Sequence, residues 1–343
     1  MEIMKYRLKK KKIAAVAIYL VICSNYIYSE DCDDGYTYFS ELPESCTIND
    51  GNHCLYNSDL TALSDIINEN NLDSSSPIHV GTQSWNDSRL KVLTGTYNPN
   101  ASWAINSQLQ ILPDSFGNLT GLTALYLEWH SLTSLPDSFS QLTNLLTLDM
   151  DNNWLSSLPE DIGNISNLIN LDLGYNQLAS IPESVCDINF SITSYFYLFN
   201  NNLTSLPDCM CELDINWSGF DGDFYPYFGI GGNQLCETTS IPCCITLSDN
   251  FTISLEQFYY SHILVMPQSC SDGSDYYGQD LGDLNGDGYW NVLDIVNLAN
   301  CVLAESCAIL EYGCAGDING DSGYNILDIV NLVSCVLAQN CGG

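Results

Sequence analysis

Two segments near the C-terminus carry oxygen-bearing side chains at spacings that suit a calcium ion. They run from Asp283 to Asp294 and from Asp317 to Asp328, and the second begins 34 residues after the first. A hard cation takes roughly six to eight oxygen ligands, which such a loop supplies from positions 1, 3, 5, 7, 9 and 12. The predicted ligands are Asp283, Asn285, Asp287, the Tyr289 carbonyl, Asn291 and Asp294, and then Asp317, Asn319, Asp321, the Gly323 carbonyl, Asn325 and Asp328. The sequence therefore predicts two bound Ca²⁺ ions.

A helix is predicted after each loop. Apolar residues recur at positions i, i+3, i+4 and i+7, namely Ile295, Leu298, Ala299 and Val302 after the first loop, and Ile329, Leu332, Val333 and Val336 after the second. The run L-D-I-V-N-L follows both loops, and both end in Asp rather than Glu. This pair of loops, in residues 280–343, resembles the type I dockerin domain, a calcium-folded module that docks secreted proteins onto cohesin receptors.

The resemblance implies a small all-α module that folds on two calcium ions and attaches the chain to a cohesin-type or other extracellular partner. The residues at loop positions 10 and 11 would contact that partner, and here they are Val292, Leu293, Ile326 and Leu327, where dockerins often carry hydroxyl residues. The second loop also departs from the pattern, because Ser322 stands where the turn favours glycine. The alternative is a module that folds on calcium and serves only as a C-terminal cap.

The N-terminus has the pattern of a signal peptide. Basic residues, including the run 9–12, precede an apolar stretch from Ile13 to Cys23. This stretch is too short to span a bilayer comfortably, so residues 1–29 are predicted to be cleaved, with an uncleaved anchor as the alternative. We therefore expect a secreted or extracellular protein, with attachment to a cell surface as a further option and no membrane insertion once the leader is removed.

The charge balance excludes one class of partner. The formal net charge is −34, and six of the eight basic residues lie in the predicted leader. Without the leader, Arg89 and Lys91 face 41 acidic residues (42 less Glu2), which gives a net charge near −39. Such a chain cannot neutralise phosphates, so nucleic-acid binding is excluded and contact with an anionic membrane is disfavoured.

Cysteine usage indicates disulfides. Fifteen of the sixteen cysteines lie beyond the leader, and none has a spacing that suggests zinc or thiol-redox chemistry. The odd number leaves one thiol free or bonded elsewhere. The spacing does not fix the pairing.

The middle of the chain is a repeat array. Prolines recur every 23 residues at Pro113, Pro136, Pro159 and Pro182, and Pro207 follows after 25. Each ends an L-x-x-L-P or L-x-x-I-P step, and from Pro136 on an exact or looser copy of L-x-x-L-x-L-x-x-N-x-L precedes it, as in Leu145 to Leu155. This pattern resembles the leucine-rich repeat and covers residues 89–236. Because such units bury their apolar faces only against each other, we expect an α/β solenoid with covered ends.

The flanking segments are predicted to supply those covers. Residues 30–88, which include Leu60 to Ile67, resemble the N-terminal cap of extracellular leucine-rich repeat proteins. Residues 237–270 would form the C-terminal cap, with the stretch from Thr246 to Met266 strand-like and covering that end. Residues 271–279, rich in Ser, Gly and Asp, are predicted to be a linker to the calcium-loop module.

The repeat register predicts a ligand-binding surface on the concave face. Side chains between and after the strand leucines should point into the concavity. They are Tyr126, Glu128, Trp129, Asp149, Asp151, Asp172, Tyr175, Tyr195, Tyr197, Phe199 and Tyr227. Aromatic residues suit a protein or glycan ligand, and carboxylates suit a basic peptide.

No catalytic motif is present in the sequence, so no enzyme activity is expected. The predicted function is that of a secreted calcium-binding interaction protein. Two alternatives are a structural cell-surface protein that does not dock, and a carbohydrate-binding accessory protein that uses the aromatic half of the concavity.

Overall fold

The computed structural model describes most of the chain beyond the predicted leader. The described residues are 32–101, 104–222, 225–236, 241–258, 260–271, 273, 275–276, 278–307, 310, 312–320 and 323–338. The predicted signal peptide (1–29) lies outside them, and so does Asp321, a predicted ligand of the second loop. Within the part of the chain that the structure describes, no helix has the length and apolar character needed to cross a membrane.

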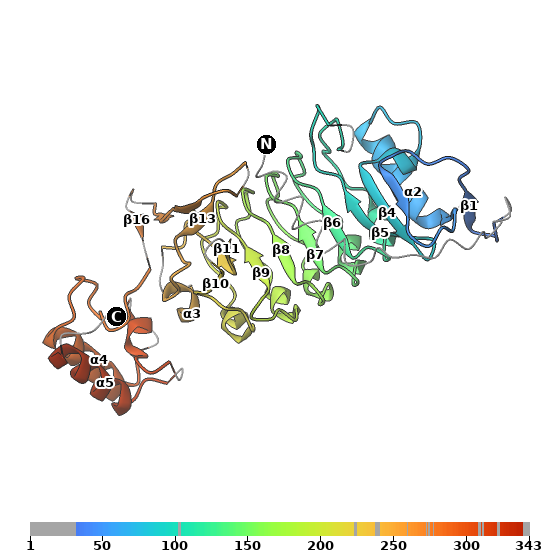
Figure 1. The fold of residues 1–343 in the computed structure, drawn as a ribbon. Helices are drawn as coiled ribbons and strands as arrows, with labels where there is room; N and C mark the ends of the chain where they lie inside the picture. Colours follow the sequence, from blue (N-terminus) through green and yellow to red (C-terminus); the bar gives the residue numbers. More distant parts are fainter. Residues whose placement is uncertain are drawn as a thin grey trace.

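A parallel sheet runs along the repeats because one short strand from each unit pairs with its neighbours (Figure 1). The strands are β5 (Arg89–Thr94), β6 (Ala124–Tyr126), β7 (Thr147–Asp149), β8 (Asn170–Asp172), β9 (Tyr195–Tyr197) and β12 (Phe228–Gly229). Equivalent residues face each other, so that Leu125 pairs with Leu148 and Leu148 with Leu171. The predicted leucine-rich repeat solenoid is confirmed.

Short 3-10 helices line the opposite side of the solenoid, one for each unit. They are η2 (Asp114–Asn118), η3 (Asp137–Gln141), η4 (Ile162–Asn164), η5 (Glu183–Asp187) and η6 (Asp208–Glu212). Pro136 and Pro182 directly precede η3 and η5 with φ of −67°, because the proline ring fixes this angle and so aims the chain into the helix. The apolar core lies between these helices and the sheet.

Asparagines at equivalent positions hold the turn that follows each strand. The Asn153 side-chain oxygen accepts a bond from the Leu132 N–H (3.2 Å), and its amide donates to the Leu127 carbonyl (2.8 Å). Asn176, Asn201 and Asn233 make equivalent bonds in later units. These bonds satisfy backbone groups that the narrow turn would otherwise leave buried and unpaired.

The N-terminal cap extends the sheet beyond the repeats. Its elements are β1 (Tyr36–Tyr38), β2 (Cys46–Ile48), β3 (Cys54–Tyr56), α2 (Asn57–Asn70), η1 (Pro77–His79) and β4 (Thr82–Asn86). β4 pairs antiparallel with β5, and β2 pairs parallel with β4. An ion pair between half-buried Arg89 and buried Asp59, Nη2 to Oδ1 at 2.9 Å, joins α2 to β5, and the Cys32–Cys54 disulfide closes the end. Among the described cysteines Cys46 is free, and burial raises the pKa of its thiol to about 11.

Three disulfides near the C-terminal cap involve no residue of the calcium-loop module: Cys186–Cys209 joins η5 to η6, and Cys211–Cys244 and Cys236–Cys270 join the last repeats to the cap. The elements of this region are β10 (Phe220–Asp221), β11 (Tyr225–Pro226), α3 (Cys243–Thr246), β13 (Ile253–Leu255), β14 (Ile263–Val265) and β15 (Gln268–Ser269). β13 and β14 form an antiparallel hairpin. Part of the predicted linker is ordered here, because β16 (Asp275–Tyr276) pairs with β15.

The calcium-loop module follows with the two predicted helices, α4 (Val292–Ala304) and α5 (Ile326–Ala338), and the turn η9 (Gly313–Gly316). Its core contains Leu284, Leu298, Ala315 and Leu332. Cys301–Cys307 closes a loop at the end of α4, and Cys243–Cys314 links the module to the C-terminal cap.

Candidate functional site

The first loop folds around the carboxylate of Asp283. This carboxylate accepts hydrogen bonds from the N–H groups of Gly286 (2.8 Å), Asp287 (3.2 Å) and Gly288 (2.8 Å). Gly286 and Gly288 have φ of 68° and 76°, a left-handed conformation that favours glycine. The loop therefore turns tightly about its first predicted ligand, as a calcium loop requires.

Asp294 closes the first loop from the start of α4. Its Oδ1 accepts from the Leu284 N–H (3.0 Å) and its Oδ2 from the Asn291 N–H (2.9 Å), while Asn291 caps the helix through the Leu293 N–H. The side chain is fully buried, and this burial raises its pKa, with smaller contributions from the nearby charges of Asp283 and Asp287. Three predicted ligands thus lie within electrostatic reach of each other. A divalent cation fits this donor set, because it would offset their mutual repulsion.

The second loop shares part of this arrangement in its described residues. Asp328 Oδ1 accepts from the Asn319 N–H (3.2 Å) and Oδ2 from the Asn325 N–H (2.9 Å). Asp328 is fully buried, and Gly320 has φ of 69°, as Gly286 does at the equivalent position. Asp328 and Asn325 therefore occupy the places of Asp294 and Asn291, whereas Asp328 Oδ1 is bonded by the third residue of its loop rather than the second. Asp321 lies outside the described residues.

The four predicted docking residues lie at the surface. Val292 and Leu293 begin α4, and Ile326 and Leu327 begin α5. Sequence reasoning missed two further members of this surface, Val296 and Val330, one turn along each helix. All six side chains are between 47% and 69% exposed. Their signal was present in the sequence, since residues four apart share one face of a helix. We call these six residues the paired apolar patch.

The predicted concave residues do share one face of the sheet. Tyr126, Asp149, Asp172 and Tyr197 pair in register across β6, β7, β8 and β9. Tyr126, Trp129, Tyr175, Tyr195 and Tyr227 are half-buried, whereas Glu128, Asp149, Asp151, Asp172, Tyr197 and Phe199 are buried. The face is therefore largely covered.

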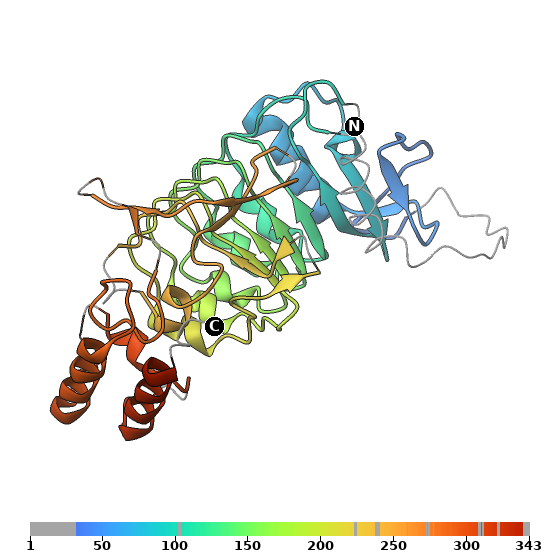
Figure 2. The ribbon, with the colours of Figure 1, turned by 60° about the vertical axis from the view of Figure 1, so that its left-hand side comes forward.

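The cover is the loop that joins β13 to β14, with described residues 256–258 and 260–262. The hairpin extends over the strands of the repeats in Figure 2. The Tyr175 hydroxyl donates to the Leu255 carbonyl (2.6 Å), and the Tyr260 hydroxyl donates to Asp172 Oδ1 (3.3 Å). Phe258 stacks on Trp129 with ring centroids 5.3 Å apart. The stretch from Thr246 to Met266 was expected to cover the end of the solenoid, and this part of it lies on the concave face instead.

This cover corrects the predicted ligand surface. Tyr197 and Phe199 form a buried aromatic cluster with Leu255 and Tyr260. A ligand could reach those two side chains only if the loop moved away. Tyr260 removes the rings of Tyr197 and Phe199 from contact with water. This burial of apolar surface stabilises the covered arrangement.

Three buried carboxylates meet beneath this cover. Oxygen atoms of Asp149, Asp151 and Asp172 all lie within 4.8 Å of one another. These residues could hold a cation, although the sequence predicted them as ligand contacts rather than as metal ligands. The neighbouring Glu128 is also buried and accepts a short hydrogen bond from the Thr96 hydroxyl.

His130 stands where later units have the ladder asparagine. Its Nδ1 accepts from the Leu109 N–H (2.9 Å), so its Nε2 carries the proton and donates to the Gly95 carbonyl (2.6 Å). Burial lowers the pKa of His130 to about 4. The ring is therefore neutral at pH 7 and holds the turn as asparagine does elsewhere.

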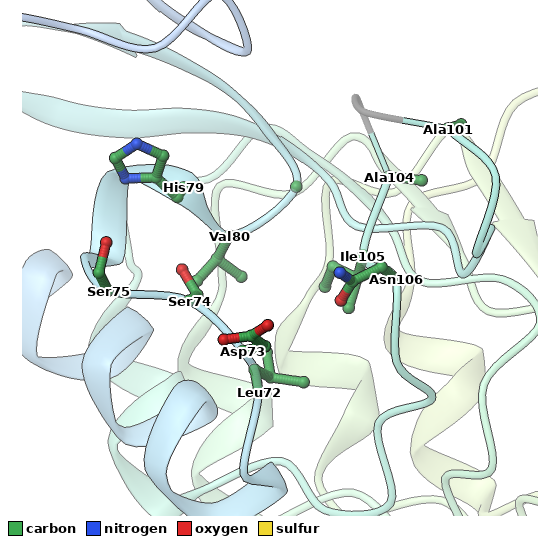
Figure 3. A pocket seen from close by; sticks show the side chains of 11 residues that line it. Leu72, Asp73, Ser74, Ser75, His79, Val80, Ala101, Ala104, Ile105 and Asn106 are labelled. Carbon is green, nitrogen blue, oxygen red and sulfur yellow. The ribbon is translucent and has the colours of Figure 1, made fainter.

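A cavity of about 230 Å³ lies in the N-terminal cap (Figure 3). His79, Ser74 and Asp73 line one side, and Ile105 and Asn106 face them. The predicted site residues do not line it.

No protein-family model and no curated protein matches the chain. Among solved structures, a plant ice-binding protein shares 20% identity over 57% of this chain and 61% of its own, with a TM-score of 0.43. A leucine-rich repeat protein of Leptospira interrogans shares 24% over 55% of both chains, with a TM-score of 0.34. The leucine-rich repeat ectodomain of the Arabidopsis thaliana receptor kinase SOBIR1 shares 20% over 52% of this chain and 94% of its own, with a TM-score of 0.38.

The chain thus spans less than two thirds of the first two of these structures. Identities and TM-scores at this level assign no function. The leucine-rich repeat architecture is established by the strand ladder and its register.

Proposed function

We propose that the chain is a secreted, calcium-dependent attachment protein, in which the calcium-loop module docks onto an extracellular protein partner of the cohesin type. The observation that carries this proposal is the paired apolar patch. Three large apolar side chains are exposed at the start of each helix, and exposed apolar surface of this kind marks protein contacts. The seven described disulfide-bonded cysteines between Cys186 and Cys270 are typical of an oxidising compartment, which supports secretion.

The patch sits next to both loops, which connects docking to calcium. Val292 and Ile326 directly follow the predicted ligands Asn291 and Asn325. Ion binding would order each loop and with it the first turn of its helix, where the patch residues stand. Bound Ca²⁺ would also reduce the self-repulsion of a chain with a formal net charge of −34.

Once the module has docked, the repeats of this chain would bind a protein or glycan ligand. No catalytic role is part of this proposal. A second candidate function is a structural protein whose module is only a calcium-folded cap. The Cys243–Cys314 disulfide favours it, since this bond fixes the module to the end of the solenoid.

An affinity experiment with the full mature chain separates the two. The bait is incubated with the extracellular fraction of the source organism, and separately with a purified type I cohesin, in calcium and in chelator. The double variant Leu293→Asp/Leu327→Asp places charge in the patch. The matched control Leu303→Asp/Leu337→Asp changes exposed leucines later in the same helices.

Docking predicts a partner held in calcium, released by chelator, lost from the patch variant and kept by the control. A partner held equally by parent and patch variant would place recognition in the repeats. The module would then be a cap.

A further inference from the structure

Most repeat units have one position at which an asparagine, or His130, holds the turn after the strand. The residues that follow this position, or its equivalent in the first unit, form a regular strip along one side of the solenoid. They are 108–111, 131–134, 154–157, 177–180 and 202–205. In each group the second residue is a buried leucine, and the other three side chains are exposed or half-exposed. We call the outward residues of these five groups the flank band.

The backbone of the flank band is a hydrogen-bonded ladder. The N–H of Trp154 donates to the Leu132 carbonyl, and the N–H of Gln177 donates to the Leu155 carbonyl, both at 2.9 Å. The Ser131 and Asn202 N–H groups make equivalent bonds at 2.9 Å. Segments paired in this way lie about 4.8 Å apart. The band therefore repeats its side chains at a constant interval along the solenoid axis.

The band carries no charge, although the chain is strongly acidic. None of its residues is Asp, Glu, Lys or Arg, in a chain with 42 acidic residues. An exposed acidic residue follows the proline of every unit, directly beyond the band: Asp114, Asp137, Glu160, Glu183 and Asp208. Carboxylates such as Asp149 and Asp151 occupy the strand face on the other side. A neutral strip thus runs beside an exposed acidic row, which repels an anionic ligand and would draw a cationic ligand away from the strip.

Trp154 occupies the middle group and is 57% exposed. An exposed indole offers a flat apolar face next to water, and an aromatic ring of this kind packs well on the C–H face of a sugar. Ser131 and Gln177 stand at the same position in the adjacent groups. Their hydroxyl and amide groups can donate and accept hydrogen bonds, as sugar hydroxyls require.

We propose that the flank band binds a neutral polysaccharide extended along the solenoid axis. One sugar stacks on Trp154, and its neighbours form hydrogen bonds with Ser131 and Gln177. The ladder interval is close to the length of one pyranose unit in an extended β-linked chain, so successive groups meet successive sugars. This surface is separate from the paired apolar patch and from the covered concave face.

The test measures retention of the full mature chain, in calcium, on amorphous cellulose, xylan, mannan and starch, with alginate and polygalacturonate as acidic counterparts. Trp154→Ala is expected to weaken binding to the retained neutral polysaccharide by about tenfold or more, as for other anchoring tryptophans at binding surfaces. The control Phe258→Ala removes a ring that is 61% exposed on the concave-face loop and should leave binding unchanged.

A second matched pair tests the band itself. Gln177→Glu places a carboxylate in the band, and Gln141→Glu places one on η3; both side chains are exposed in the parent. Only Gln177→Glu should weaken binding. The proposal is overturned if no neutral polysaccharide is retained, if only the acidic ones are, or if Trp154→Ala binds like the parent. Trp154→Ala should still retain the module's protein partner. This control shows that weaker polysaccharide binding by the variant does not arise from a loss of docking.

Discussion

Cys243 and Cys314 form a disulfide across 71 residues of sequence. The bond joins α3 of the C-terminal cap to η9, the turn that lies between the two calcium loops. The Tyr324 hydroxyl of the second loop lies 3.8 Å from Cys243 Sγ at the same junction. The module is thus attached to the solenoid at two points, through this bond and through the chain that continues from β16.

Removal of this bond should free the module without impairing its loops. The double variant Cys243→Ser/Cys314→Ser leaves every predicted calcium ligand intact, so calcium stoichiometry should not change. Small-angle scattering should give a larger radius of gyration, and limited proteolysis should cut faster within 271–279. Cys301→Ser/Cys307→Ser is the control, because that bond closes a loop inside the module. Unchanged scattering and proteolysis would show that noncovalent contacts hold the module in place.

The concave-face loop is expected to be held by Tyr260 rather than by Phe258. Tyr260 is 4% exposed and its ring lies 5.6 Å from that of Phe199. Tyr260→Ala should therefore lower the free energy of unfolding by about 3 kcal/mol. Phe258 keeps one aromatic contact at the surface, so Phe258→Ala should cost about 1 kcal/mol or less. Urea unfolding measures both values, and equal small losses would indicate a loosely held cover.

The repeat architecture could be predicted because its determinants are local and periodic. The leucines of one unit, such as Leu145 and Leu148, and the following Pro159 recur with the spacing that a stacked core imposes. The two predicted calcium loops rest on the same kind of local signal, since their predicted ligands lie within twelve residues of each other. Local spacing also placed the helices that follow them.

The concave cover and the disulfide pairing could not be predicted in this way. Tyr260 meets Asp172, a residue 88 positions earlier, only because of the path that the β13–β14 hairpin takes. Cys243 meets Cys314 for a comparable reason, and no periodic pattern encodes either contact. The F-Y-Y run from Phe258 to Tyr260 was the available signal for the cover, but it does not specify which surface it contacts.

His130 should make the stability of the repeats depend on pH. Its pKa is about 4 in the folded chain because of burial, against about 6.5 when unfolded. Since the folded pKa is the lower one, the unfolded chain binds the extra proton, and stability present above pH 6.5 is lost as the pH falls towards 4. The loss is on the order of 3 kcal/mol.

The variant His130→Asn isolates this contribution. Asparagine holds the same position in later units and does not titrate, so the variant should keep the turn and lose the pH-dependent component. Denaturant unfolding at pH 7 and pH 4.5 gives the free energy of unfolding of parent and variant. The carboxylates titrate in both proteins alike, so their contribution cancels when the two are compared. Parallel pH profiles in the two proteins would contradict a buried neutral histidine.

Calcium should bind the two loops independently, with Asp294 and Asp328 as the closing ligands. Calorimetric titration of the parent should show two sites, and Asp294→Ala or Asp328→Ala should remove the site of its own loop. At a calcium concentration of about 100 times the Kd, each site stabilises the module by about 3 kcal/mol, so chelator should lower its unfolding midpoint. Asp280 is an exposed acidic residue just before the first loop. The variant Asp280→Ala is the matched control and should retain both sites. Two unaltered sites in either loop variant would refute the ligand assignment, because a fully buried carboxylate that closes a calcium loop cannot be lost without loss of the ion.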